Sequence, residues 1–410
     1  MERRVVITGA GVLSALGDSP SKLHLALCEG RIGLGRLSLF ETDGLSCHLG
    51  GEIQSFSAKT YLGEKNLRAL DRTSQLVASA AQMALDDSGW TGRARTTRDV
   101  GLVLGTMFCS VRTISQFDRR ALMAGPAYAS PMDFANTVIN AAAGQTAIRH
   151  NLRGVNSTIA AGSSSGLQAL AYATELIRVG RADALLAGGA DELCFESFYG
   201  FERAQLLCGS NHRPGDFPIP LDARRNGFAL GEGAALLMLE DADSAAARGA
   251  RVLGEIAGHG NGYDTSQGTD DRKSVDSIAR AMKLALTDAR RSIDEIGCAS
   301  LSANGSVRLD NHEGRAVTSL GESAKRIPVT AVKSMLGETL GASGAFQTIA
   351  LIEALRAGVL PGIARLEEMD LECGLESASS DCRELNASSG LVNSIGFDGS
   401  CCSIVVAARK

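Results

Sequence analysis

The chain has 410 residues, which corresponds to roughly two to three domains, and 44% of them are hydrophobic, enough for a large buried core. Aromatic residues are scarce (4%) and glycine is abundant (47 residues), a composition that favours a layered α/β protein over a β-sandwich or a coiled coil. The net charge of −5 provides no positive field, which argues against a nucleic-acid partner and against an anionic membrane surface.

The N-terminus leads directly into a predicted strand, Val5-Val6-Ile7-Thr8-Gly9, with no charged-then-apolar signal segment before it. The glycines that follow do not complete the G-x-G-x-x-G pattern of a dinucleotide site, so we expect no nucleotide cofactor. The ten cysteines contain no CxxC and no His-paired spacing, which argues against a metal site and against a disulfide framework. Because no apolar run approaches the roughly 18 residues of a membrane span, we expect a protein of a reducing cytoplasm.

Strands and helices are predicted in the same order in two halves, which we place at 1–250 and 251–410. The first half is predicted to contain strand 5–9, helix 73–85, strand 100–105, helices within 110–150, strand 155–159, helix 167–179 and strands 184–189 and 233–239. The second half is predicted to contain strand 252–257, helix 275–290, strands 298–302 and 329–332, helix 343–358 and strands 390–395 and 403–407. The repeated order indicates an old duplication, and the near-continuous apolar strands are typical of sheets covered on both faces.

The stretch Ala161-Gly162-Ser163-Ser164-Ser165-Gly166 joins the predicted strand 155–159 to the predicted helix 167–179. This order of strand, tight small-residue turn and helix is typical of a nucleophile elbow, whose strained turn lifts one side chain to the mouth of a pocket. The lifted side chain here would be Ser163. We interpret it as a retained corner residue whose hydroxyl binds a neighbouring backbone group. The alternative is a serine nucleophile, which requires an adjacent base.

Ordered motifs along essentially the whole chain resemble the β-ketoacyl-acyl-carrier-protein synthases. They are VVITGAG at 5–11, AGGADE at 187–192, PLDARRNGF at 220–228, KSM at 333–335 and NS-x-GF at 393–397. The resemblance implies the thiolase-type α/β fold, with two duplicated halves in five layers, α-β-α-β-α. It also implies an obligate dimer, in which the strand 155–159 runs antiparallel to its counterpart across the two-fold axis.

The same resemblance marks three departures at the catalytic positions. The family has a Cys at the elbow, where this chain has Ser163. It has His-Gly-Thr where this chain has Asn304-Gly305-Ser306, and Lys-Ser-Met-x-Gly-His where this chain has Lys333-Ser334-Met335-Leu336-Gly337-Glu338. In the family, the Cys carries the acyl group and the two His help decarboxylate a malonyl unit and stabilise its enolate. All three catalytic side chains are therefore replaced, while Lys333 is retained.

The replacements remove the chemistry that condensation needs. A thiol with a pKa of about 8.5 supplies thiolate near neutral pH, whereas a serine hydroxyl needs an adjacent base. Asn304 donates a hydrogen bond but does not exchange a proton as imidazole does. An ionised Glu338 would place a negative charge where the enolate forms, and loss of one oxyanion donor alone costs about 10²–10³ in rate. We therefore expect no condensation by this chain alone.

A member of the family with this pattern is the chain length factor, the β subunit of type II polyketide synthases. The resemblance implies a non-catalytic subunit that pairs with an active ketosynthase α subunit, is supplied by acyl carrier protein, and shapes an aromatic or polyene polyketide tunnel. Two alternatives stay open. One is a ketosynthase-like acyltransferase or hydrolase that uses Ser163 with Glu338 as base, and the other is a purely structural, homodimeric pseudo-ketosynthase.

Further roles come from the same resemblance. The residues expected to line or gate the acyl tunnel are Met107, Phe108, Ile114, Phe117 and Phe397, and the alternative for the first four is ordinary core packing. Lys333 is expected to tie the two halves together. Asp398 replaces a glycine of the family's flexible loop, and Asp310 and Glu313 match its Asp-x-x-Glu. Cys401 and Cys402 alternate into the last strand and are expected to be packing residues.

Overall fold

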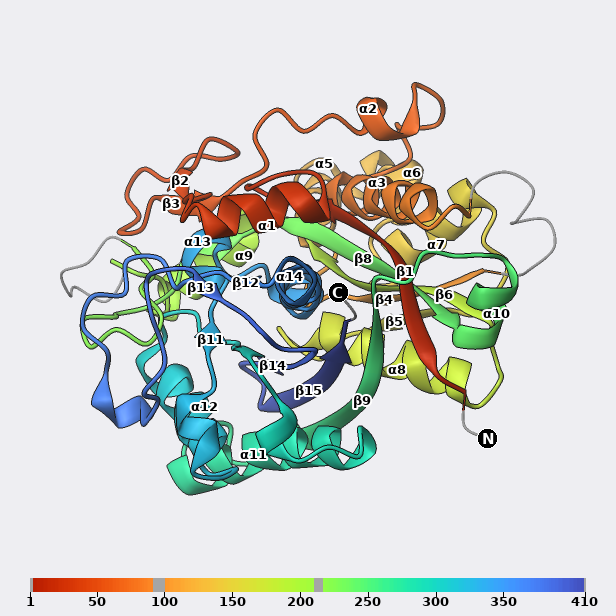
Figure 1. The fold of residues 1–410 in the computed structure, drawn as a ribbon. Coiled ribbons are helices and arrows are strands. Elements are labelled where there is room, and N and C mark those ends of the chain that lie inside the picture. The colour runs from red at the N-terminus through yellow and green to blue at the C-terminus, as the bar shows by residue number, and fades with distance from the viewer. Residues whose placement is uncertain (1–2, 91–99, 210–216, 409–410) are drawn as a thin grey trace.

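Ten strands form one continuous mixed sheet in the computed structural model, which describes residues 3–90, 100–209 and 217–408 (Figure 1). The strand order is β11-β10-β14-β15-β9-β1-β8-β6-β4-β5. One half of the sheet, from its centre to one edge, consists of β1 (Val5–Leu13), β8 (Gly233–Asp241), β6 (Ala184–Asp191), β4 (Gly101–Gly105) and β5 (Asn156–Ile159). The other five are β9 (Gly254–Tyr263), β15 (Ser400–Ala407), β14 (Ser389–Ile395), β10 (Ala299–Ser300) and β11 (Val329–Thr330).

The two groups of five strands repeat one topology. In each group the strands of the large sheet lie, from the centre outward, in the chain order first, fifth, fourth, second and third. The pairings also correspond, because the two inner pairs are antiparallel and the two outer pairs are parallel in both groups. A short antiparallel contact between β1 and β9 joins them. The duplicated halves predicted from the sequence are therefore confirmed.

Helices cover both groups of strands and fill the space between them. On one outer side lie α3 (Arg72–Asp87) and α7 (Ala141–His150), and on the other α11 (Asp271–Asp288) and α12 (Val307–Thr318). Between the two groups of strands lie α8 (Ser165–Arg178) and α14 (Ser343–Ala357). The five layers expected of the thiolase-type fold are present.

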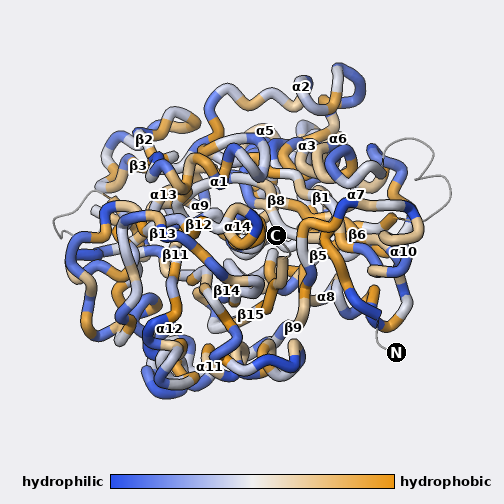
Figure 2. Tube along the Cα trace, viewed as in Figure 1, coloured by the Kyte–Doolittle hydropathy of each residue, from blue (hydrophilic) through white to orange (hydrophobic). Residues whose placement is uncertain are grey.

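The largest hydrophobic cluster lies in the central layer and takes residues from both halves, among them Ile7, Leu170 and Phe346. α14 is apolar nearly all round, as a helix buried between two sheets must be. In Figure 2, hydrophilic residues gather on the outer helices α11 and α12. Local sequence signals also set where individual helices begin. For example, α3 begins where the Asp71 carboxylate accepts a hydrogen bond from the Ser74 backbone N–H.

Further helices and strands surround the large sheet and the helices that cover it. The remaining helices are α1 (Pro20–Cys28), α2 (Ala58–Leu62), α5 (Val111–Ala124), α6 (Pro131–Phe134), α9 (Phe195–Arg203), α10 (Ala242–Ala247) and α13 (Lys333–Leu336). The remaining strands are β2 (Gly35–Arg36), β3 (Leu49–Gly51), β7 (Leu230–Gly231), β12 (Val359–Leu360) and β13 (Arg383–Glu384). Within the described ranges, none of the helices has the length and apolar character needed to span a bilayer.

Candidate functional site

The elbow between β5 and α8 has the geometry that its sequence predicts. Gly162 adopts φ +54, a left-handed conformation that favours glycine, and the chain then turns directly into α8. A Cβ on Gly166 would lie 2.3 Å from the Gly341 carbonyl oxygen, so only glycine permits this approach between the halves. The Ser165 hydroxyl fastens the turn, since it donates to the Gly162 carbonyl at 2.6 Å and accepts from the Ala161 N–H at 2.8 Å.

Ser163 lies at the apex of this elbow and is fully buried. Its Oγ has no hydrogen-bond partner among the residues that the structure describes. Its backbone carbonyl, in contrast, accepts from the Ser394 hydroxyl at 3.3 Å. The expectation that the Ser163 hydroxyl binds a neighbouring backbone group is therefore wrong, because Ser165 rather than Ser163 makes those bonds. Ser163 also lacks the adjacent base that a serine nucleophile needs.

Glu338 lies in the second half of the chain, and both of its carboxylate oxygens accept hydrogen bonds. Oε2 accepts from Lys333 Nζ at 2.8 Å and from Asn304 Nδ2 at 2.9 Å. Oε1 accepts from the Ser343 hydroxyl at 2.7 Å and from the Leu340 N–H at 3.1 Å. The carboxylate is buried, and its charge is matched by the equally buried Lys333. Four donors, one of them the Lys333 cation, hold this anion in place, and none of them is Ser163.

Asn304 is held on both sides of its amide. Nδ2 donates to Glu338, and Oδ1 accepts from the Ser306 N–H at 3.0 Å. Asp310 fixes the loop beneath it by accepting from the Asn304 N–H at 3.0 Å and the Gly305 N–H at 3.2 Å. Burial raises the pKa of Asp310, and the nearby Arg225 partly opposes that shift. The sequence-predicted residues Asn304, Lys333 and Glu338 thus form one hydrogen-bonded cluster.

Lys333 does not join the two halves, contrary to expectation. Its ammonium donates to Glu338 and to the Ser302 hydroxyl at 3.1 Å, and both partners lie in the second half. One carboxylate that does link the halves is that of Asp191, at the end of β6. Its carboxylate accepts from the Gly341 N–H of the second half at 2.8 Å, and from the Met107 and Phe108 N–H groups at 2.8 and 2.9 Å. Asp191 stands in the AGGADE motif, which is the signal that could have identified it.

Glu313 is a second buried carboxyl next to this cluster. Oε1 accepts from the Ser302 N–H at 2.8 Å and from Asn393 Nδ2 at 2.5 Å, whereas Oε2 has no partner among the described residues. Burial raises the pKa of Glu313 to about 7, although the hydrogen bond from Asn393 opposes the shift. Glu313 therefore titrates near neutrality.

The predicted tunnel residues separate into two places. Phe397 packs on Phe228 and Phe201 with ring centroids 5.2 and 5.5 Å apart, and Phe108 lies 6.1 Å from Phe201. Met107 packs against the same cluster. Phe117, in contrast, lies on α5 with its ring 5.9 Å from Phe134, which is 61% exposed.

Ile114 also lies on α5, a helix with no buried residue. The structure therefore brings Met107, Phe108 and Phe397 together and leaves Ile114 and Phe117 elsewhere. Sequence reasoning missed Phe201, because α9 was not predicted.

Asp398 fastens its loop to the elbow. Its Oδ1 accepts from the Ser400 hydroxyl at 2.7 Å, and the same hydroxyl lies 2.7 Å from the Ser164 Oγ and 2.9 Å from the Ala161 carbonyl oxygen. A Cβ on Gly162 would lie 2.7 Å from Asp398 Oδ1, so the loop and the elbow pack without spare space. The aspartate thus restrains a loop in which the resemblance implies glycine.

Cys401 and Cys402 follow this loop and are buried in β15. Burial raises the pKa of Cys401 to about 12, and burial likewise raises the pKa of Cys402. Both side chains are thus neutral thiols with the surroundings of packing residues rather than of a nucleophile.

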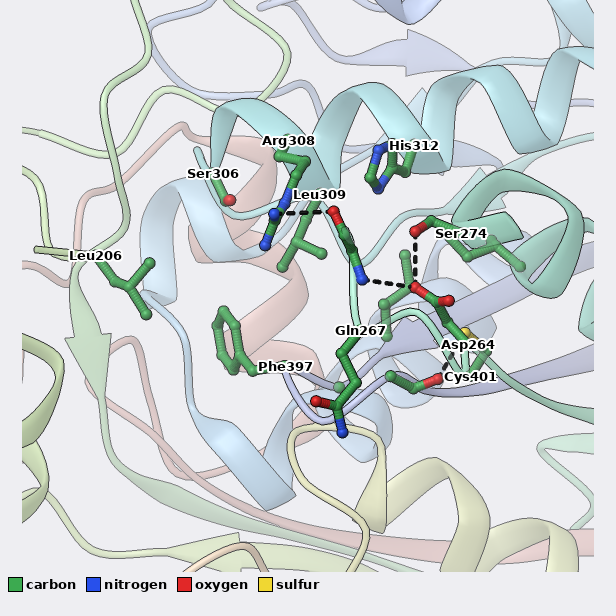
Figure 3. A pocket seen from close by; sticks show the side chains of 15 residues that line it. Leu206, Asp264, Gln267, Ser274, Ser306, Arg308, Leu309, His312, Phe397 and Cys401 are labelled. Atoms are coloured by element: carbon green, nitrogen blue, oxygen red, sulfur yellow. Dashed lines mark hydrogen bonds between the residues drawn. The ribbon is translucent and has the colours of Figure 1, made fainter. Parts of the chain in front are cut away.

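Phe397 forms one wall of a cavity of about 150 Å³, with Leu206 and Gln267 beside it (Figure 3). Arg308 crosses its rim and donates to the Gly268 carbonyl oxygen at 2.9 Å. Asp264 accepts from the Ser274 hydroxyl at 2.7 Å. Arg308, Asp264 and Ser274 are therefore engaged with the protein itself. No group of three His, Cys, Asp or Glu within the described residues has an arrangement that could hold a metal ion.

Comparisons with known proteins agree with this architecture. Residues 2–245 match the family described as "Beta-ketoacyl synthase, N-terminal domain", and residues 253–367 match "Beta-ketoacyl synthase, C-terminal domain". A "3-oxoacyl-[acyl-carrier-protein] synthase 2" from Synechocystis sp. is 30% identical over 400 residues, covering 97% of this chain and 96% of that protein. A "Putative polyketide beta-ketoacyl synthase 1" from Streptomyces halstedii is 33% identical over 416 residues, covering 97% and 96%.

Among solved structures, "The ishigamide ketosynthase/chain length factor" superposes with a TM-score of 0.91 at 30% identity, with 100% of each chain covered. The family matches over both halves and this superposition lead to one conclusion. The chain belongs to the β-ketoacyl synthase family, with the thiolase-type fold.

Proposed function

We propose that this chain is a non-catalytic chain length factor, which pairs with an active ketosynthase and shapes the tunnel for a growing polyketide chain. The observation that supports this most is that protein donors already bind the Glu338 carboxylate. Its carboxylate is paired with Lys333 and accepts a hydrogen bond from Asn304, so the catalytic position of the second half holds a buried anion.

That anion opposes the chemistry of the family. Condensation by decarboxylation passes through an enolate, and the site must stabilise its developing negative charge with donors. Here the Asn304 and Lys333 donors are already directed at Glu338. Rearranging them toward a substrate would leave Glu338 buried without its cation, which costs free energy. Ser163, without a base, adds no route to a covalent acyl intermediate.

A partner subunit is supported by the surface of the first half. β5 is the last strand of the sheet, and its outer edge is available for pairing with another chain. The segment 122–139 also exposes apolar side chains, namely Leu122, Met123, Tyr128, Met132, Phe134, Val138 and Ile139. Exposed apolar side chains gathered in this way are typical of protein interfaces. Since this chain lacks reactive groups, the proposed partner is one with an intact Cys and two intact His.

The remaining assignments follow from this one. The acyl chain would be delivered by acyl carrier protein, in the cytoplasm and without a bound cofactor. Met107, Phe108 and Phe397 would border the tunnel, since they pack in one cluster around Phe201. Ile114 and Phe117 would act through the subunit interface instead, because α5 lies on the surface.

Co-expression with an intact ketosynthase tests the proposal. We expect a stable one-to-one complex that elongates malonyl units, while the isolated chain has no condensing activity. A well-behaved homodimer that turns over acyl carrier protein by itself would contradict it.

Intact-mass analysis separates the alternatives. Incubation with acylated carrier protein should leave the chain unmodified. An acyl adduct on Ser163 would favour the acyltransferase or hydrolase instead. A stable homodimer with neither adduct nor affinity for a ketosynthase would favour the purely structural pseudo-ketosynthase.

A further inference from the structure

Two of the ten cysteines differ from the others in their surroundings. Eight are buried, whereas Cys382 is exposed and Cys28 is half-buried. These two lie 354 positions apart, yet Cys382 Sγ donates to the Cys28 carbonyl oxygen at 3.0 Å. Burial and, after it, the neighbouring Cys382 side chain raise the pKa of Cys28. The fold therefore places two free thiols next to each other at an accessible position.

A histidine completes the cluster. His24 lies one helical turn before Cys28 on α1, and its Nε2 is 3.5 Å from Cys28 Sγ. Burial lowers the pKa of His24, so its imidazole is neutral at pH 7 and has a lone pair that accepts a proton. Since no group of three His, Cys, Asp or Glu in the described chain is arranged to hold a metal, this cluster favours covalent chemistry between the sulfurs.

We infer that Cys28 and Cys382 form a redox-modification site, at which a peroxide converts the two thiols into a reversible disulfide. The exposed Cys382 sulfur attacks the peroxide O–O bond, takes one oxygen as a sulfenic acid and releases one water or alcohol. The Cys28 sulfur then attacks the Cys382 sulfur, its proton passing to His24 Nε2. The S–S bond forms as the S–O bond breaks, and the oxygen leaves with a proton as water. Two thiols are oxidised and one peroxide is reduced.

The order of the two steps follows from the surroundings. Burial, together with the neighbouring Cys382, raises the pKa of Cys28 to about 12, so Cys28 is a poor first nucleophile. It needs the local base that His24 provides. The exposed Cys382 meets the oxidant first, and Cys28 resolves the sulfenic acid before further oxidation.

The site is selective because the other thiols are protected. Burial raises the pKa of five of them to about 12, namely Cys109, Cys194, Cys298, Cys373 and Cys401. A buried, protonated thiol reacts slowly with peroxide. These cysteines therefore act as internal controls within the same molecule.

The disulfide would connect the end of α1 to the segment just before β13. α1 packs on the central helix α14, and β13 pairs with β12, the strand that follows α14. A bond at this point closes a loop that includes most of the chain, which restricts the unfolded state more than the folded one. We expect the oxidised protein to unfold at a higher urea concentration than the reduced protein.

Peptide mapping of the full folded chain after graded hydrogen peroxide, with free thiols alkylated beforehand in one sample and afterwards in another, tests the inference. We expect one new peptide that links Cys28 to Cys382, that disappears on treatment with dithiothreitol, and that forms while the five protected thiols remain reduced. The variant Cys28→Ser should lose the linked peptide and accumulate sulfinic acid at Cys382, since no resolving thiol remains. His24→Gln should form the same peptide more slowly.

Two results would overturn the inference. One is sulfinic acid on Cys382 of the unaltered chain with Cys28 still a free thiol. The other is a linked peptide that forms only after unfolding in denaturant, or that lowers the urea midpoint, because either would show that the fold does not hold the thiols in bonding position.

Discussion

The elbow and the polar cluster around Glu338 are held together in different ways. The elbow keeps the left-handed Gly162 and the tight approach of Gly166 to the Gly341 carbonyl, both of which are demanded by backbone packing. The cluster around Asn304 and Glu338 is instead held by a closed set of side-chain hydrogen bonds. A glycine at such a contact supports the fold whatever the site does, because a side chain there would collide with the neighbouring backbone. The following predictions test this contrast.

The largest effect is expected at the buried ion pair. Glu338→Ala leaves Lys333 buried without its anion and should destabilise the protein by about 3–5 kcal/mol in urea unfolding. The matched control is Glu322→Ala, which breaks an ion pair of the same length, 2.8 Å, at an exposed site. The control should leave the urea midpoint almost unchanged. Equal effects of the two substitutions would contradict the closed cluster.

The pH dependence of stability should expose Glu313. Its pKa is about 7 in the folded state, above the value of about 4.3 in an unfolded chain, so the folded state binds the proton more tightly. The stabilising contribution of the Glu313 proton is fully present below the pKa of the unfolded chain, and it is lost as the pH rises through the folded-state pKa of about 7. Glu313→Gln should therefore flatten the decline in urea midpoint from pH 5 to pH 8.

Glu295→Gln provides the control for that experiment. Hydrogen bonds from Ser292 lower the pKa of this exposed carboxyl, so its removal should not flatten the decline. A Glu313→Gln protein with the pH profile of the unaltered chain would show that Glu313 stays ionised in the folded state.

The elbow should be sensitive to a single methyl group. Gly162→Ala forces alanine into a left-handed conformation, at a cost of about 1–2 kcal/mol, and brings its Cβ against Asp398. Gly144→Ala is the control, since that glycine lies inside α7 with open space around it. We expect the control to be neutral or slightly stabilising, measured by thermal unfolding. A harmless Gly162→Ala would mean that the elbow is not tightly packed.

The smallest effect on the fold, and a visible one on product, is expected at Phe108. In a complex with a ketosynthase, Phe108→Ala should remove a ring that packs on Phe201 and lengthen the polyketides, as measured by mass spectrometry of the products. Phe117→Ala should change product length less, because Phe117 packs on the exposed Phe134. The reverse ranking would place the end of the tunnel at α5 rather than at the aromatic cluster.

The sequence predicts the frame well where apolar periodicity is strong. Long buried strands such as β6 and β8, and the helices α8 and α14, lie within a few residues of their predicted places. The pattern misses α12, because its buried face carries the polar Asp310, His312 and Glu313 before the apolar Ala316 and Val317. It overestimates β10, since the segment 298–302 is buried but only Ala299 and Ser300 belong to the strand.

The sequence predicts which residues make up the candidate site, but not which of them contact one another. The motifs identify Ser163, Asn304 and Glu338, but they do not show that Glu338 accepts from Asn304, 34 positions away, while the Ser163 hydroxyl has no partner among the described residues. In the same way, Phe117 and Phe108 look alike in sequence, and only the position of α5 separates them. Local pattern carries no information about such long-range contacts.

The most direct test of a non-catalytic role compares two substitutions in the reconstituted complex. Ser163→Ala removes a hydroxyl that has no partner among the described residues, so the account predicts the same products at the same rate. Replacing the elbow Cys of the partner ketosynthase by Ala should abolish product. Loss of product from Ser163→Ala in a complex that still assembles would contradict the account.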